Sequence, residues 1–237
     1  NSTGGYDGKG AYEFDGVDDD VIIYHDSSLS FDDTASYTVS AWFKSLGSAD
    51  YQRIIAKQSG AIDNYLMRID SGAGANKLKF FIGDDLVGIS AGSVESTMNV
   101  EDGVWRLATA VVNRNDNTLK LYINGELQDS ADISGAGDCS NTADVYLGQK
   151  YDDTQVLNGS IDDLMIFNRS LSAEQIKLLY QNQTQTIAAE ETIAGEEWQA
   201  CVTANDGEGE GPEECSSNMT IYDFDAPEII LHSPENN

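Results

Sequence analysis

The sequence VWRLATAVVNRNDNTLKLYINGEL, residues Val104 to Leu127, decides the fold class of this chain. It holds two runs in which apolar and polar residues alternate, and the second run ends in Asn124-Gly125. Asn-Gly beside alternating runs is the strongest short signal for a β-hairpin, because both residues tolerate the positive φ that a type I′ turn requires. The stretch therefore predicts antiparallel strands joined by tight turns.

Two further segments extend this pattern toward both ends of the chain. Residues Gly10 to Asp19 read GAYEFDGVDD, and residues Asn158 to Ser172 read NGSIDDLMIFNRSLS. Together with a strand opened by Trp105 and the motif L-x-L-Y-x-N-G, they resemble the laminin-G-like (concanavalin A-like) jelly-roll family. The resemblance implies that residues 1–182 form an all-β, two-sheet antiparallel jelly-roll sandwich that ends in a short helix.

Short alternating runs separated by turn residues recur throughout this region, which is the signature of an all-β fold. Both faces of one run are fairly apolar, with Phe43 on one face and Trp42 on the other, which favours an inner strand. We expect Trp42 and Trp105 in the core. The expected strands are 20–25, 37–44, 53–57, 65–70, 77–82, 86–91, 105–113, 118–123, 144–149 and 160–168.

A short helix is predicted after the last of these strands. Ser172 and Gln175 have the spacing of a capping box, in which Gln175 reaches back to the amide of Ser172. Ile176, Leu179 and Tyr180 then form an apolar stripe on one side of the predicted helix.

The character of the sequence changes after Gln181. Residues 183–224 resemble the last strands of an immunoglobulin-like domain, with Trp198 as the buried tryptophan. Such a sandwich needs about 100 residues, so its earlier strands could lie upstream of Asn1 or be supplied by another subunit. Cys201 and Cys215 flank a glycine-rich turn, which predicts a disulfide across a hairpin in an oxidising compartment. Cys139 is left over as a free thiol or a link to another chain. Residues 225–237 read as a linker and a terminal strand, which could begin a further domain or be given to a neighbour.

Charge excludes some partners. The 237 residues include 41 acidic and 13 basic side chains, for a formal net charge of −28. Such a polyanion repels nucleic acid and anionic lipid, so we expect neither as a partner, and no apolar run is long enough to span a membrane. We expect an extracellular or cell-surface glycoprotein, because five N-x-Ser/Thr sequons occur. They begin at Asn1, Asn158, Asn168, Asn182 and Asn218.

Calcium is the cofactor that the resemblance implies. Members of this family often hold a structural calcium between the first and last strands, and Asp15, the carbonyl of Gly16 and Asp162 match those positions. Asp18, with Asp19 and Asp20, adds charge nearby. The resemblance also implies a second possibility at the rim of the sandwich, where Asp63 matches and Asp144 or Asp138 could approach. Calcium binds six to eight oxygen ligands, which these residues would supply.

A sugar site is a further possibility, because aromatic platforms near loops suit carbohydrate. Tyr51, Tyr65 and Tyr151 lie in or beside predicted loops. Catalysis is not expected, since the E-x-D-x-x-E strand motif of related glucan hydrolases does not occur.

Two functions follow from these observations. The first is a non-enzymatic structural protein of the cell surface, a repeating unit of a filament, sheath or stalk that self-associates through β-strand complementation. The second is an adhesin module of a larger secreted protein that binds glycans or another protein.

Overall fold

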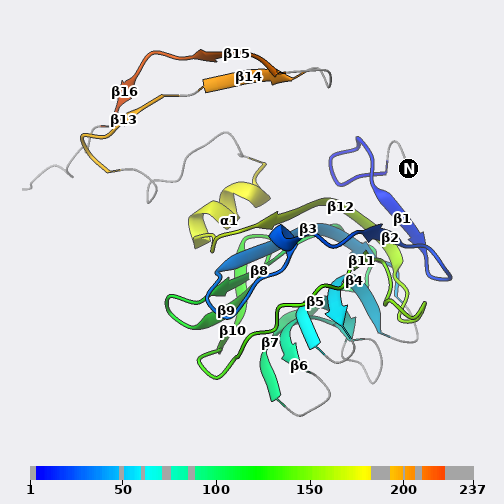
Figure 1. Ribbon diagram of the computed structural model, residues 1–237. Coiled ribbons are helices and arrows are strands. Elements are labelled where there is room, and N and C mark those ends of the chain that lie inside the picture. The colour runs from blue at the N-terminus through cyan, green and yellow to red at the C-terminus, as the bar shows by residue number, and fades with distance from the viewer. Residues whose placement is uncertain are drawn as a thin grey trace, which may run out of the picture. The chain divides into compact units, whose positions relative to one another are not determined.

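Two six-stranded antiparallel sheets form the first of the two units into which the chain divides, between Gln183 and Thr184 (Figure 1). The computed structural model describes residues 4–47, 51–59, 62–70, 76–84, 89–182, 193–199, 201–205 and 210–221. The predicted all-β jelly-roll sandwich with a short closing helix is confirmed.

Each sheet combines strands from distant parts of the sequence. Sheet A contains β1 (Tyr12–Asp15), β12 (Asn158–Phe167), β3 (Tyr37–Ser45), β8 (Arg106–Asn113), β9 (Thr118–Ile123) and β10 (Glu126–Asp132), in that spatial order. Sheet B contains β2 (Val21–Ile23), β11 (Val145–Leu147), β4 (Gln52–Ser59), β5 (Ile62–Asp70), β6 (Lys77–Asp84) and β7 (Ile89–Asn99). The 3-10 turn η1 (Ser27–Leu29) and the helix α1 (Ala173–Tyr180) complete this unit within the described residues.

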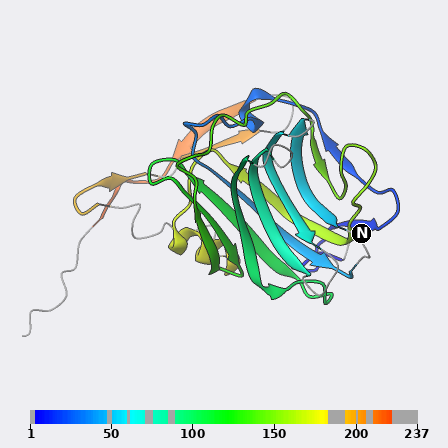
Figure 2. The ribbon, with the colours of Figure 1, turned by 90° about the horizontal axis from the view of Figure 1, so that it is seen from below.

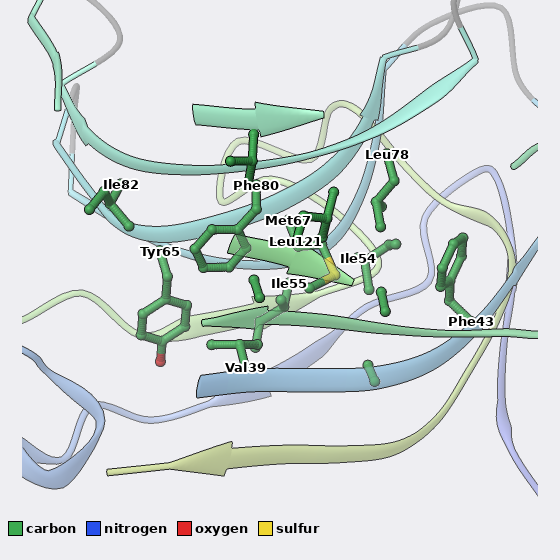
Figure 3. Close-up of a cluster of buried hydrophobic side chains, with 14 of the residues drawn as sticks. Val39, Phe43, Ile54, Ile55, Tyr65, Met67, Leu78, Phe80, Ile82 and Leu121 are labelled. Atoms are coloured by element: carbon green, nitrogen blue, oxygen red, sulfur yellow. The ribbon is translucent and has the colours of Figure 1, made fainter. Parts of the chain in front are cut away.

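The core lies between the facing sides of the two sheets (Figure 3). Alternate residues of β3, among them Val39 and Phe43, meet Met67 and Phe80 from sheet B, and all four are fully buried. Burying one such side chain contributes about 1.5–3 kcal/mol, so this layer supplies most of the driving force for folding.

The hairpin predicted at Asn124-Gly125 is present between β9 and β10. Asn124 and Gly125 have φ values of 53° and 81°, as a type I′ turn requires. The side-chain oxygen of Asn124 also accepts a hydrogen bond from the amide of Leu107 at 2.9 Å, which ties the turn to β8. Strand β10 was not among the expected strands, because its side chains are mostly exposed and polar. Strand β7 extends well beyond the expected 86–91.

The outward side of sheet A is also covered, in part by α1. Ile176 of the helix packs with Val111 and Tyr122, and the predicted capping box of Ser172 and Gln175 is present. Trp42 is buried as expected, but on this outward side, where its ring stacks on Tyr6 at a centroid distance of 4.1 Å.

Trp105 departs from the expectation of a core residue. It precedes β8, is only partly buried, and lies under the ammonium of Lys44 at 5.2 Å from the ring centroid. The alternating pattern places Trp105 inside a strand, but the strand begins one residue later, at Arg106, so the pattern does not govern the orientation of Trp105.

One long side of the sandwich is closed by contacts between the edge strands β7 and β10. The amide of Glu95 donates to Asp129 at 3.0 Å, and the hydroxyl of Thr97 donates to Gln128 at 2.6 Å. These bonds cover donors that an edge strand would otherwise present to another chain.

The second unit contains two strand pairs within its described residues. Strand β13 (Glu197–Trp198) pairs with β16 (Met219–Thr220), and β14 (Cys201–Asn205) pairs with β15 (Glu210–Cys215). The predicted disulfide joins Cys201 and Cys215, which face each other in register. The immunoglobulin-like assignment is not confirmed, and Trp198 is only partly buried rather than the core tryptophan expected of that fold. Residues 225–237 lie outside the described residues.

We predict that Gly159→Ala strongly destabilises the first unit. A Cβ atom at Gly159 would lie 2.0 Å from the carbonyl oxygen of Lys44 on the neighbouring strand β3, so the two backbones would have to separate. We expect a loss of about 1–3 kcal/mol in the free energy of unfolding, measured by urea denaturation. The control is Gly135→Ala, whose Cβ would meet no atom within 4 Å. Equal stability of both variants would contradict the close approach of β12 to β3.

Candidate functional site

The aspartates predicted to bind calcium between the first and last strands lie at two separate places. Asp15, Asp18 and Asp19 gather at the turn after β1, where a carboxylate oxygen from each lies within 4.8 Å of the others. The turn depends on Gly16, whose φ is +80°. The side chain of Asp19 accepts from the amide of Asp15 at 2.9 Å, and the side chain of Asp15 accepts from the amide of Val17 at 2.8 Å.

Asp162 does not join this group. The register places Asp15 opposite Asn158, four residues from Asp162 along β12. At about 3.4 Å per residue this separates the two aspartates by about 14 Å, too far for one calcium ion. Oδ2 of Asp162 instead accepts from the amide of Tyr6 at 3.3 Å. Burial raises the pKa of Asp162, and the carboxylate of Asp163 adds to the rise.

Asp162 also lines a surface pocket of about 470 Å³ beside β1. Strand β12 is irregular here: its pairing with β3 shifts register after Asp162, and Asp163 has a φ of 42°. The other lining residues are Gly10, Ala11, Tyr12 and Glu13.

The rim predicted as a second calcium site holds a buried lysine. Lys57 of β4 is fully buried, and its ammonium donates to the carbonyl of Ala143 and lies 3.0 Å from Nδ1 of His25. Burial lowers the pKa of Lys57, and the carboxylate of Asp144 opposes that change. A fixed cation beside Asp144 repels a divalent ion, so this part of the rim does not suit calcium.

The other two aspartates predicted at the rim, Asp63 and Asp138, differ in burial and in the groups that they contact. Asp63 is 1% exposed and lies close enough to the thiol of Cys139 to act on its pKa, which burial raises. Asp138 is exposed and accepts a hydrogen bond from the amide of Ser140 at 2.8 Å. Cys139 is free and buried, which does not suit a disulfide to another chain.

The three tyrosines predicted for sugar binding differ in accessibility. Tyr65 is fully buried in the core and its hydroxyl donates to the carbonyl of Leu29 at 3.2 Å, so its assignment as a ligand-binding residue is wrong. Tyr151 is 43% exposed and lies 5.0 Å from the ammonium of Lys150. Tyr51 is 38% exposed, and the guanidinium of Arg68 lies 4.7 Å from its ring centroid.

Tyr51 and Arg68 belong to the outer face of sheet B, the side turned away from the core. Figure 2 looks onto this sheet, and no helix of the described part of the chain crosses it. The outer face consists of side chains that alternate with the core residues along each strand. Two cross-strand rows define it: Ile22, Tyr146, Ala56, Leu66, Phe81 and Ser93, and beside them Arg53, Arg68, Lys79 and Glu95.

Aromatic rings lie at two places on this face. Phe81 is the second ring beside Arg68, whose guanidinium carbon is 4.5 Å from its centroid. At the other side of the sheet, Tyr146 of β11 lies near Tyr24, which is 80% exposed. Burial raises the pKa of Tyr146, with further contributions from nearby carboxylates that include Asp20. Sequence reasoning missed these two tyrosines, because both lie in or beside predicted strands.

The sequons also differ in their surroundings. Asn158 is a poor acceptor for a glycan, because its Nδ2 donates to the carbonyl of Gly47 at 3.1 Å and the residue is partly buried in β12. Asn168, Asn182 and Asn218 are exposed, so glycosylation there stays a prediction. Asn1 lies outside the described residues.

The sequence also contains one spacing that is associated with catalysis. Gly88, Ser90 and Gly92 have the G-x-S-x-G spacing of a nucleophile elbow. Such an elbow needs a sharp turn from a strand into a helix. Ile89 to Gly92 instead begin the long strand β7, so the motif lacks its structural context.

Comparison with known families decides the assignment of the first unit. Residues 14–177 match the family model described as the concanavalin A-like lectin/glucanases superfamily, in its laminin G form. The chain belongs to this superfamily. No curated protein matches the sequence significantly. Within the described residues, no helix is long and apolar enough to cross a membrane.

Solved structures with this fold include toxin binding domains. The binding domain of Paraclostridial Mosquitocidal Protein 1 has a TM-score of 0.57 and 14% identity, over 75% of this chain and 48% of that chain. The botulinum neurotoxin serotype D binding domain has a TM-score of 0.57 and 20% identity, over 74% and 43%. The serotype D ligand-binding domain in complex with N-acetylneuraminic acid has a TM-score of 0.53 and 20% identity, over 71% and 41%. The matched part of this chain thus covers less than half of each of these structures, and the likeness concerns the fold.

Calcium stays a prediction, and the Asp15, Asp18 and Asp19 group is the place where the described residues could hold it. We expect millimolar calcium to raise the unfolding temperature of the protein, because an ion bound only to the folded state adds about 2.7 kcal/mol at one hundred times its dissociation constant. Asp18→Asn with Asp19→Asn should abolish the rise, whereas Asp33→Asn, an exposed loop carboxylate elsewhere, should preserve it. If Asp162→Asn abolishes it instead, the ion lies beside β12.

Proposed function

We propose that the chain is a non-enzymatic, extracellular module of a larger protein that binds glycans on the outer face of sheet B. The observation that carries this proposal is the exposed ring of Tyr51, held against the guanidinium of Arg68 beside Phe81 on a sheet face that no described helix covers. An aromatic ring fixed in place offers an apolar platform to a sugar ring, and the adjacent polar groups can bind its hydroxyls.

Three further observations support an extracellular binding role. The disulfide between Cys201 and Cys215 belongs to an oxidising compartment. The superfamily includes lectins, and one solved structure with this fold is described as a complex with N-acetylneuraminic acid. Ser90 and Gly92 of the G-x-S-x-G spacing lie in strand β7 rather than at an elbow, which favours binding over catalysis.

We predict that Tyr51→Ala abolishes binding on a glycan array on which the unaltered chain binds saturably. Loss of the ring removes the platform, and a single aromatic contact in a binding site costs about 1–3 kcal/mol, or about fivefold to 150-fold in affinity. Tyr151→Ala and Tyr24→Ala test two further exposed rings in the same format.

The matched control is Tyr12→Ala, which removes a 63% exposed tyrosine from sheet A. An array without any signal, or equal binding by the Tyr51 and Tyr12 variants, would count against a glycan site at Tyr51. A protein would then be the remaining class of ligand for this face.

Assembly into a filament, sheath or stalk is a second candidate, and we propose it on the basis of the second unit. Its described strands form only two-stranded pairs, and an isolated pair of this kind is marginally stable in water. Strands from a neighbouring chain would complete them by β-augmentation. The terminal strand predicted at 227–231 is a candidate donor, although it lies outside the described residues.

We predict that a chain ending at residue 224 stays monomeric under conditions in which the full chain assembles, as judged by mass from light scattering. Removal of the donor would leave the acceptor pairs incomplete. Ile230→Lys in the full-length chain separates strand pairing from chain length, since it keeps the length and alters the apolar run. Unchanged assembly in both variants would exclude strand donation from this terminus.

A further inference from the structure

We propose that the ligand on the outer face of sheet B is a neutral, linear polysaccharide whose chain runs across the strands, from Tyr51 to Tyr146 and Tyr24. This inference rests on the proposed function, because it names the class of glycan for the same face. Its starting point is the distribution of the aromatic rings, which form two separate groups on one sheet.

The first ring group surrounds Arg68 of β5. The guanidinium carbon of Arg68 lies 4.7 Å from the ring centroid of Tyr51 and 4.5 Å from that of Phe81. Nε of Arg68 also donates to Asp70 at 2.7 Å, so the guanidinium is held in place and in turn orients the two rings. Tyr51 is 38% exposed in this position. The group therefore offers an aromatic surface whose cation is already paired.

The second ring group lies at β2 and β11. Tyr146 of β11 is in register with Ile22 of β2, and both side chains point away from the core, because Val145 and its partner Ile23 point into it. Tyr24 continues the outward alternation of β2 and is 80% exposed, while Ile22 is 44% exposed. Two tyrosines and an isoleucine thus gather at this side of the sheet.

One cross-strand row connects the two groups. From Tyr146 the register leads through Ala56 of β4 and Leu66 of β5 to Phe81 of β6. Three strand spacings of about 4.8 Å place Phe81 about 14 Å from Tyr146. Ala56 and Leu66 are 3% and 1% exposed, so the surface between the groups is apolar and filled. One sugar ring is too short to reach both groups, whereas a chain of several sugars reaches them together.

The charges of the protein favour an uncharged chain. Beside the first ring group, Arg68 and Lys79 both form ion pairs with Asp70, and Lys79 also pairs with Glu95. In the whole chain, acidic residues outnumber basic ones by 41 to 13, so an acidic polysaccharide would be repelled. A second copy of this chain would bring the same net charge of −28 and is disfavoured for the same reason. A carboxylate has several acceptor sites, so Glu95 can also accept from a sugar hydroxyl.

An extended peptide fits this face less well than a polysaccharide. Backbone donors and acceptors of a sheet point along the sheet toward neighbouring strands, so its face has no edge to which a peptide strand could add. Sugar rings need no such edge, because their apolar faces stack on aromatic side chains while their hydroxyls bind the polar groups nearby.

The test is isothermal titration of the full chain with neutral oligosaccharides of increasing length. The probes are cello-, manno- and xylo-oligosaccharides, each from the disaccharide to the hexasaccharide. Within at least one series, we expect the affinity to rise by about tenfold or more once the chain reaches the second ring group, because the second contact is made without a further loss of translational freedom. Added salt should change this affinity little, since no net charge is recognised.

Tyr24→Ala and Tyr146→Ala remove the second ring group one ring at a time. Each should lower the affinity for the hexasaccharide and preserve that for the disaccharide, which binds at Tyr51 and does not reach them. The Tyr24 ring is 80% exposed, so its loss leaves the packing of β11 intact. The matched control is Tyr12→Ala on sheet A, which should keep the full dependence on length. A dependence on length that survives in both the Tyr24 and the Tyr146 variants would overturn the inference.

Equal affinity for short and long members of every series that binds would show recognition of a single sugar. That result would overturn this inference and leave the proposed glycan-binding function in place. Binding by none of the three series would overturn it as well. The glycan array then judges the proposed function separately, because branched and charged glycans would still give a signal there.

Discussion

The burial of both sides of the central strands of sheet A is the constraint on which the rest of this structure depends. Strand β3 turns Val39 and Phe43 toward sheet B and Trp42 toward the outside, and all three are buried. Buried polar side chains of β3 find hydrogen-bond partners: the hydroxyls of Ser40 and Thr109 lie 2.8 Å apart, and the hydroxyl of Thr38 donates to the carbonyl of Arg169. An inner strand of this kind needs cover on its outer side as well as a facing sheet.

Helix α1 and the segment before β1 provide that cover on sheet A. Ile176 packs onto Val111, and the ring of Tyr6 lies on Trp42. The same segment brings the amide of Tyr6 to Asp162, so a carboxylate that the sequence predicts as a calcium ligand instead holds this segment in place. Sheet B, by contrast, carries no described helix on its outer face. Its polar and aromatic side chains are therefore the ones available for recognition, which is why the functional proposal concerns this face.

The sequence by itself determined the features that depend on neighbours along the chain. The turn at Asn124-Gly125, the alternation within β3 and β8, the capping box at Ser172 and the pairing of Cys201 with Cys215 follow from local φ preferences, strand periodicity and short spacing. Only the tertiary structure decided which distant residues meet. The register of β1 on β12 separates Asp15 from Asp162, and packing buries Tyr65 while it leaves Tyr24 exposed. The row from Arg53 to Lys79 exists only because three strands align, and no local pattern in any one strand contains that information.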